Sequence, residues 1–396
     1  MGTLSLIIAI IASTEIIGPL SDVFRSLLPA LLLVPMFIFH GRNFDWENGL
    51  FWLMFTGAVL VSASISAVLC RVDELRSLVL AFACITPLAF LSFSFDSNDP
   101  FMERYLQGIA MVVSGLVLYL ATQADSSRPT MLFEASLGKP ELSMTWPALV
   151  GFSRMYNGWY KGWLLFLVAA TIVAICLIFS RMALVTTVAC LAVLFARRSK
   201  ALFLILAGLV FLALVSRPEL FRELLEWYRF ADFEPDASRG TIRAMAWEII
   251  QDNPWWGVGA GNIRYFLHAD KPLHAHNTVM TAWLEYGVVG GALVFSFLVY
   301  VGSLAVRLWR HGGLGRYFAL SLATWLATSL VEDLFHKPGA MLLFVAFLSY
   351  SRVILQDSGD EDYEMSAARD RMPSFESVRT SEDYYALNSA LNQRSS

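Results

Sequence analysis

The chain has 396 residues, of which 57% are hydrophobic and 16% are charged, and its mean hydropathy is +0.57. Soluble proteins are about half apolar and a quarter charged, and a single water-exposed domain of this composition would carry large apolar patches. Composition therefore excludes an ordinary soluble protein. The net charge of −4 gives no indication of a nucleic-acid partner.

Taken in chain order, apolar segments recur that approach the ~20 residues needed to cross a bilayer. They lie at 3–20, 24–40, 50–69, 77–94, 105–122, 162–179, 182–197, 200–215, 288–306, 317–331 and 339–355. A weaker segment lies at 142–159. The first segment lacks a basic n-region and more spans follow it, so we expect a membrane span and not a cleaved signal peptide. The sequence predicts an all-α, polytopic membrane protein with 11 to 12 transmembrane helices.

Basic residues beside these segments predict the orientation of the chain, because lysine and arginine concentrate in cytoplasmic loops. Two tight turns are rich in them, with Arg197, Arg198 and Lys200 in one and Arg307, Arg310 and Arg316 in the other. If both turns are cytoplasmic, the long segment between them faces the periplasm. This predicts four regions: a transmembrane bundle at 1–215, a periplasmic loop at 216–287, transmembrane helices at 288–355, and a disordered cytoplasmic tail at 356–396.

The loop at 216–287 holds the residues that suggest chemistry. Extracytoplasmic loops seldom carry much positive charge, and the planar fork of arginine suits phosphate oxygens. The basic and histidine residues of the loop are Arg217, Arg222, Arg229, Arg239, Arg243, Arg264, Lys271, His268, His274 and His276. We therefore expect an anionic ligand on this face.

Helical spacing of apolar residues within the loop predicts a helix around Arg243 that ends at Asn253 and Pro254. Gly257 and Gly259 follow, and we expect a tight turn with exposed amides there. Taken alone, a Gly-x-Gly pair marks an ordinary turn more often than a phosphate site.

Several motifs follow one another in a recognisable order. Ser180-Arg181 ends one span, Arg243 precedes Trp247 by four residues, and Pro254-x-x-Gly257-x-Gly259 comes next; His276-Asn277 and Glu285-x-Gly287-x-x-Gly290 then lead into another span. This order resembles the O-antigen ligase and polymerase superfamily, enzymes that transfer sugar chains from undecaprenyl pyrophosphate at the outer face of the bacterial inner membrane. The resemblance is strong from 162 to 306 and rests on hydropathy alone before 160.

The resemblance implies a GT-C-like fold in the bacterial inner membrane, with twelve spans, both termini in the cytoplasm and an active site that faces the periplasm. Twelve spans require that 142–159 crosses the membrane. The charge rule by itself favours eleven, because twelve would place Arg71 and Arg76 outside.

The resemblance also implies the substrates and the site. The donor would be a glycan on undecaprenyl pyrophosphate and the acceptor a lipid A-core sugar, both in contact with membrane lipids. His276 would be the general base, and Arg243 and Arg181 would hold the pyrophosphate leaving group. The residues expected to bind substrate around them are Asn277, Glu285, Arg239, Arg264, Gly257 and Gly259. No cofactor and no metal is expected, because the loop has no Asp-x-Asp cluster and the cysteines show no ligand spacing.

Each of these residues also has a structural explanation. In the structural explanation, the His276 ring only caps the helix that follows it. Arg181 is then a snorkelling residue that anchors the end of a span. Structural roles are at least as well supported as binding for Asn277 and Glu285. His268 and His274 are interpreted as ordinary loop residues, and Glu332, Asp333 and His336 as the polar end of a span.

Four functions compete. The leading hypothesis is an inverting O-antigen ligase, and the alternatives in the same class are an O-antigen polymerase and a pilin O-glycosyltransferase. Polymerases of this superfamily often have two sizeable outer loops, and the single loop at 216–287 favours the ligase. A transporter of lipid-linked glycan is less favoured, since transporters place charged residues near the bilayer midplane.

Overall fold

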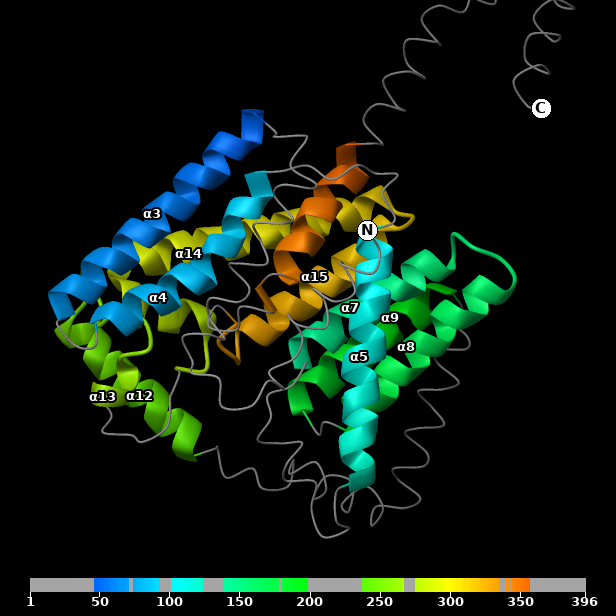
Figure 1. Ribbon diagram of the computed structural model, residues 1–396, viewed down its shortest axis with the longest axis horizontal. Helices are drawn as coiled ribbons and strands as arrows, with labels where there is room; N and C mark the ends of the chain where they lie inside the picture. Colours follow the sequence, from blue (N-terminus) through cyan, green and yellow to red (C-terminus); the bar gives the residue numbers. More distant parts are fainter. Residues whose placement is uncertain are drawn as a thin grey trace, which may run out of the picture.

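A computed structural model describes residues 46–70, 74–92, 101–123, 139–177, 180–198, 237–266, 275–334, 340–341 and 343–356. Within these ranges every regular element is a helix, as the sequence predicts. Figure 1 shows long helices that cross one another, with α12 and α13 together at one corner of the assembly. The predicted spans 3–20, 24–40 and 200–215 lie outside the described residues, as does nearly all of the tail.

The first described helices form where the apolar segments predict them, with one difference. Helix α3 covers Trp46–Cys70 and α5 covers Phe101–Gln123. The predicted span 77–94 is wrong as a continuous helix, because α4 (Glu74–Ile85) gives way to a 3₁₀ helix, η1 (Thr86–Ser92). The break coincides with Pro87, which lacks an amide hydrogen and disfavours α geometry in the residue before it.

The weak segment at 142–159 contains a helix, but the helix is shorter than predicted. Helix α7 covers Lys139–Ser153, and a turn separates it from α8, Trp159–Leu177. Most side chains of α7 are buried, including Trp146 and Leu149. Because other helices surround α7, its serine and threonine residues face protein instead of lipid, which explains the low hydropathy of the segment.

The site is built by the later elements. Helix α9 covers Arg181–Arg198, α12 covers Ala237–Asp252, and α13 is the single turn Ile263–Phe266. Helix α14 covers Thr278–His311, α15 covers Gly315–Ser329, and a last described helix covers Leu343–Gln356. The helix that we predicted before Asn253 and Pro254 is thus confirmed as α12.

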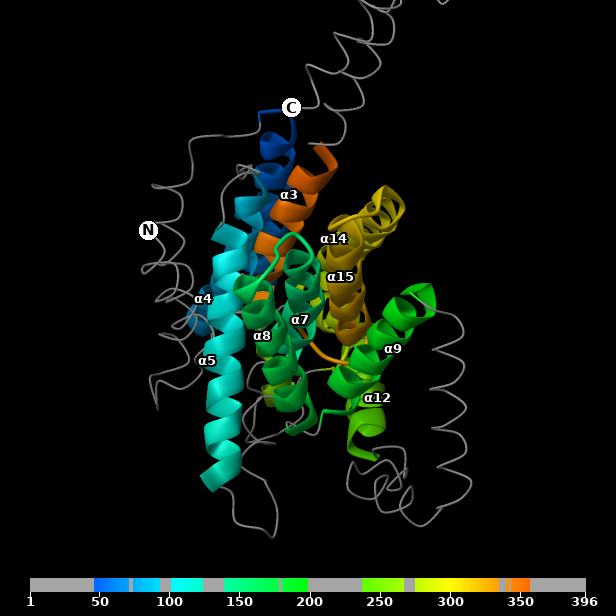
Figure 2. The same ribbon diagram turned by 90° about the vertical axis from the view of Figure 1, so that its right-hand side faces the viewer.

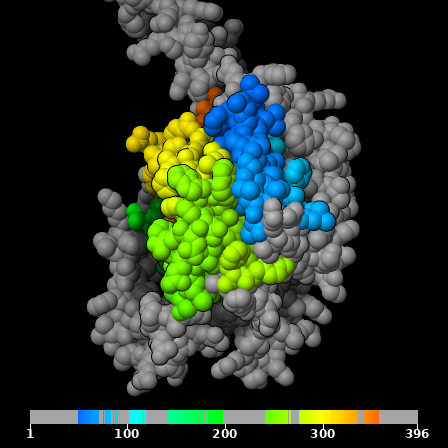
Figure 3. Space-filling model, turned by 90° about the vertical axis from the view of Figure 1, so that its left-hand side faces the viewer, coloured from blue at the N-terminus to red at the C-terminus, as the bar shows by residue number. Residues whose placement is uncertain are grey.

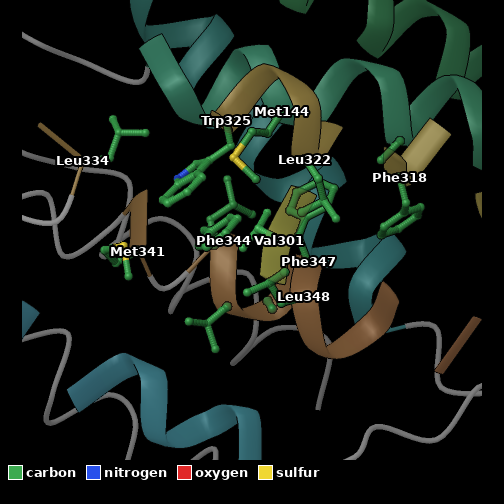
Figure 4. Close-up of a cluster of buried hydrophobic side chains, with 14 of the residues drawn as sticks. Met144, Val301, Phe318, Leu322, Trp325, Leu334, Met341, Phe344, Phe347 and Leu348 are labelled. Atoms are coloured by element: carbon green, nitrogen blue, oxygen red, sulfur yellow. The ribbon is translucent and has the colours of Figure 1, made fainter. Parts of the chain in front are cut away.

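The core lies where α7, α14, α15 and the last helix meet (Figure 4). The rings of Trp325 and Phe344 stack with their centroids 3.6 Å apart, and Phe297 packs edge-on against Phe344. Close approach of α7 and α15 depends on Gly151, where an added Cβ would lie 2.8–2.9 Å from Leu314 and Tyr317. This core fixes the position of α15, whose end borders the site.

Three described helices are long and apolar enough to cross a membrane: Gly49–Cys70, Trp159–Leu177 and Thr278–His311. Each also exposes large apolar side chains, among them Met54 and Val68 on α3 and Phe166 on α8. Such exposure is costly in water and favourable in lipid. The protein is a membrane protein.

A buried carboxylate joins α5 to the start of α8 and to the turn before it. Glu103 accepts hydrogen bonds from the hydroxyls of Tyr156 and Tyr160, each at 2.7 Å. The hydrogen bond to Glu103, together with burial, raises the pKa of Tyr156 to about 12. Tyrosine is ordinarily neutral at physiological pH, and these contacts favour that neutral donor form further.

Candidate active site

The segment 254–261, here called the glycine loop, docks onto α14 through its backbone. The amides of Val258 and Gly259 donate to the carbonyls of Leu284 and Glu285 at 2.8 and 2.9 Å, and the amide of Val288 donates to the carbonyl of Pro254 at 3.0 Å. Gly257 and Gly259 are buried and have φ of 69° and 82°. The expectation of exposed amides is wrong, because α14 already accepts the hydrogen bond of Gly259 and Asn253 accepts that of Gly257.

Helix α14 turns sharply at Gly287, here called the hinge. Gly287 has φ 72° and ψ −172°, which is not helical. An added Cβ on Gly291 would lie 3.1 Å from the Cα of Trp283, although eight residues of straight helix span about 12 Å. The segment Thr278–Tyr286 therefore folds back against the start of the segment that follows the hinge.

The hinge explains the glycine pattern of the motif Glu285-x-Gly287-x-x-Gly290. A Cβ on Gly287 would overlap the carbonyl of Trp255, and a Cβ on Gly290 would overlap the side chain of Tyr286. Only glycine adopts the φ of the hinge without strain and leaves room for the glycine loop. These glycines serve close packing of the backbone.

Two serines of α3 hold the other side of the hinge. The Ser62 hydroxyl donates to the carbonyl of Tyr286 at 2.8 Å, and the Ser66 hydroxyl donates to the carbonyl of Glu285. Neither serine was predicted as part of the site from the sequence. Their spacing of four places them on one face of an apolar helix, a pattern that marks helix–helix contact in membranes.

Glu285 is fully buried and belongs to the same corner. Its Oε1 accepts a hydrogen bond of 2.8 Å from the amide of Gly261, at the end of the glycine loop. The carboxylate thus ties the glycine loop to α14 immediately before the hinge. This contact supports the structural role that we weighed for Glu285.

Helix α12 lies along the first part of α14 and carries Arg243. A small second core joins α12, the glycine loop, α13 and α14 through Ala246, Ile250, Val258, Ile263, Ala275 and Leu284. The rings of Trp247 and Trp283 meet edge-on with centroids 5.7 Å apart, and the Trp283 indole donates to the carbonyl of Pro254 at 3.2 Å. Arg243 is exposed on the face of α12 next to His276.

The structure brings Arg243 and His276 together. Nη2 of Arg243 donates to the carbonyl of His276 at 2.8 Å. His276 is half-buried and has φ 52°, the only positive φ outside glycine among the described residues. Strained backbone of this kind concentrates at functional sites.

Asn277, and not His276, is the N-cap of α14. The side-chain oxygen of Asn277 accepts from the amide of Met280 at 2.9 Å, and its Nδ2 donates to the carbonyl of Leu330 at 3.1 Å. The interpretation of His276 as a helix cap is therefore wrong. Both polar groups of the Asn277 amide hold backbone, which supports its structural role.

The chain after α15 packs against the same turn. The hydroxyl of Thr278 donates to the carbonyl of Glu332 at 3.0 Å and accepts from the amide of Leu334 at 3.3 Å. Asp333 lies between them and is buried. Glu332 and Asp333, which we interpreted as the polar end of a span, thus border His276-Asn277-Thr278. His336, the third residue of that group, lies outside the described residues.

Arg181 is placed by the start of α9. Ser180 caps that helix, since its Oγ accepts from the amide of Ala183 at 3.4 Å. Helix α9 packs against α15 (Figure 2). The Sγ of Cys190 lies 3.5 Å from the Oγ1 of Thr324. Arg181 is thus the first residue of a helix that packs against α15, and the Leu330 carbonyl at the end of α15 accepts the hydrogen bond from Asn277.

The remaining predicted residues are placed by their backbone alone. Arg239 lies one turn before Arg243 on α12, so both are on one face of the helix. Arg264 lies in α13. His268 and His274 are outside the described residues.

Residues 165–295 match the family model of O-antigen ligases. No curated protein matches the chain closely. The O-antigen ligase match confirms the resemblance predicted from the motifs and extends from α8 to the second turn after the hinge.

The O-antigen ligase match contains all the predicted site residues, from Arg181 to Glu285. The described residues of that segment fall into two groups, one that binds backbone and one that lies at the surface. Its glycines, Glu285 and Asn277 hold backbone, whereas Arg243 and His276 meet at an accessible surface. The printed contact joins the Arg243 guanidinium to the backbone carbonyl of His276. A guanidinium can bind an anion, and an imidazole can take a proton.

Proposed function

We propose that the protein is an inverting glycan transferase of the O-antigen ligase type. The observation that carries this proposal is the contact between Arg243 and the backbone of His276 inside the segment that matches the family. A phosphate-binding group and a general base are the two groups that transfer from a lipid pyrophosphate requires.

In the proposed reaction, the imidazole of His276 takes the proton from an acceptor hydroxyl. The hydroxyl oxygen attacks the anomeric carbon of the donor glycan from the side opposite the pyrophosphate. A new glycosidic bond forms as the bond between the anomeric carbon and the pyrophosphate oxygen breaks, so the configuration inverts. Undecaprenyl pyrophosphate leaves with the bonding electrons.

Arg243 is proposed to stabilise the charge that develops on the leaving pyrophosphate. Its guanidinium has five N–H donors, and the described contact to the His276 carbonyl engages Nη2 alone. The remaining donors suit phosphate oxygens in bidentate geometry. Arg181 is proposed as a second cation, brought to the site from the start of α9.

We favour lipid A-core as the acceptor, which makes the protein a ligase rather than a polymerase. The support is the single large predicted outer loop, 216–287. The periplasmic face of the inner membrane is the proposed position of the site, because undecaprenyl-linked glycans are consumed there by enzymes of this type.

Deletion and complementation test the function and the base together. The gene would be deleted in the bacterium that carries it and restored as wild type or as His276→Asn, and lipopolysaccharide would be examined on gels. Asparagine tolerates a left-handed backbone, so this variant keeps the conformation and loses the base. General bases contribute roughly 100- to 10,000-fold, so we expect capped lipopolysaccharide to be absent with His276→Asn at normal membrane levels.

Each other result has a definite meaning. Lipopolysaccharide capped by a single repeat in the deletion strain would indicate a polymerase and reject the ligase. Normal capping by His276→Asn would reject the catalytic base. His274→Asn, in the same loop, is the matched control and should restore capping.

A further inference from the structure

Exposed aromatic side chains lie in the glycine loop, whose backbone contacts the hinge, and in α13, which follows that loop. Trp255 and Trp256 in the glycine loop are 68% and 51% exposed, and Tyr265 and Phe266 at the end of α13 are also exposed. We call these four residues the aromatic rim. Large aromatic residues grouped at a protein surface mark contact with a partner or a membrane.

The rim is fixed at the end of two membrane helices. The backbone of Trp255 contacts Gly287, and an added Cβ on Gly259 would lie 3.4 Å from the Cα of Ala67 in the last turn of α3. From Val288 to Arg307, α14 runs for about 30 Å, the thickness of the hydrocarbon core of a bilayer. With Arg307 at one boundary, the hinge and the rim lie at the other.

The rim also continues an apolar surface. Val68 and Leu69 at the end of α3 are 54% and 55% exposed, and Val289 after the hinge is 51% exposed. Figure 3 shows α3, the start of α14, and α12 with the chain that follows it together on one face. The exposed side chains of α3 and α14 suit lipid, and the rim extends their surface at the depth where apolar helices end.

We propose that the aromatic rim inserts into the headgroup region of the bilayer and anchors the catalytic segment there. Tryptophan and tyrosine favour this region because an apolar ring carries one polar group. Through α12, the anchor would fix the distance of Arg243 and His276 from the bilayer surface. The proposal requires a membrane and does not depend on glycan transfer.

Depth measurement by fluorescence quenching tests the anchor in the full-length protein. Cys70, Cys84, Cys176 and Cys190 would be replaced, and single cysteines introduced by Trp256→Cys, Trp255→Cys or Gln251→Cys would carry an environment-sensitive fluorophore. Gln251 is the matched control, since it is exposed on α12 within one turn and a half of the rim. The proteins would be reconstituted in phosphatidylcholine vesicles with or without headgroup spin-labelled lipid.

Labels at 255 and 256 should lose fluorescence to the spin-labelled headgroups and be shielded from aqueous iodide. The label at 251 should show the reverse. Equal iodide quenching at 251, 255 and 256 would overturn the anchor. Shielding of 255 and 256 by soluble polysaccharide in detergent, without lipid quenching in vesicles, would also overturn it and show instead a surface that stacks on sugar rings.

Discussion

At the scale of single residues, His276 is held from both sides in a left-handed backbone conformation that most residues other than glycine avoid. Its φ of 52° costs about 1–3 kcal/mol outside glycine, and Arg243, Asn277 and Thr278 all bind backbone around it. The hydrogen bond from Arg243 to the His276 carbonyl couples the position of the proposed base to that of the proposed phosphate ligand. A change in Arg243 should therefore affect both.

Arg243→Lys separates charge from geometry. Lysine keeps the positive charge but has neither the planar fork nor its fixed reach to the His276 carbonyl. Losing charge-assisted hydrogen bonds worth about 1.5–3 kcal/mol would slow transfer roughly 10- to 100-fold. The measurement is the transfer rate in proteoliposomes that contain the lipid-linked donor and acceptor.

Arg310→Lys, in the last turn of α14, is the matched control and should transfer at the wild-type rate. Wild-type rates for Arg243→Lys would mean that charge alone matters at this position, and that bidentate binding of the pyrophosphate is not used.

At the scale of elements, the hinge decides where His276 stands. A straight helix from Thr278 to His311 would extend about 50 Å, carrying its first residue well beyond the membrane. The reversal at Gly287 folds the first part back. The serines of α3, the glycine loop and Glu285 all make hydrogen bonds to backbone groups near the turn. His276 thereby lies beside the end of α15.

Gly287→Ala should disrupt this corner. Alanine is strained at φ 72° by about 1–3 kcal/mol, and its Cβ would also overlap the carbonyl of Trp255. We expect a lower Tm in detergent and loss of transfer, because the glycine loop must move away from α14.

Gly302→Ala in the same helix provides the comparison. An added Cβ there would lie 3.9 Å from Leu326, an ordinary contact, so Tm should stay the same or rise. If Gly287→Ala and Gly302→Ala have the same Tm, the turn at residue 287 is not required in the folded protein.

At the scale of the whole molecule, the proposed site and the basic ends of the helices lie apart. Figure 1 shows α12 and α13 at the lower end and the exit of the last described helix at the upper end. Arg307 and Arg310 lie toward the end of α14 away from the hinge. The orientation predicted from the basic turns would place these two ends on opposite sides of the membrane.

Labelling from one side of the membrane tests that orientation. In a background without native cysteines, Ser238→Cys at the start of α12 should react with an impermeant thiol reagent in intact spheroplasts. Ser358→Cys in the tail should react only after lysis. The opposite pattern would place the site in the cytoplasm and reject the proposed donor.

Chelation tests the chemistry of the whole site. Among the described residues, no group of three or more His, Cys, Asp or Glu could hold a metal ion, and the arginines are proposed to take the place of one. We expect transfer in proteoliposomes to continue at the same rate in EDTA. A loss of activity that a divalent cation restores would contradict this expectation.

The sequence by itself determined the class of the protein and the order of its motifs. Hydropathy predicted the described spans, because lipid requires long apolar helices with all backbone groups satisfied internally. Arginine chemistry and motif order predicted the family and singled out Arg243 and His276. The break at Pro87 was not predicted, although proline cannot continue a helix without losing a hydrogen bond.

Only the tertiary structure decided what each motif residue contacts. Gly257 and Gly259 suit both a phosphate loop and close packing, and the choice depends on whether α14 reaches their amides. Ser62 and Ser66 are more than 200 residues from the carbonyls they bind, a separation that no local pattern spans. The reversal at Gly287 was hidden for the same reason, because a glycine within an apolar run becomes a hinge only when partners from α3 and the glycine loop bind the backbone that it exposes.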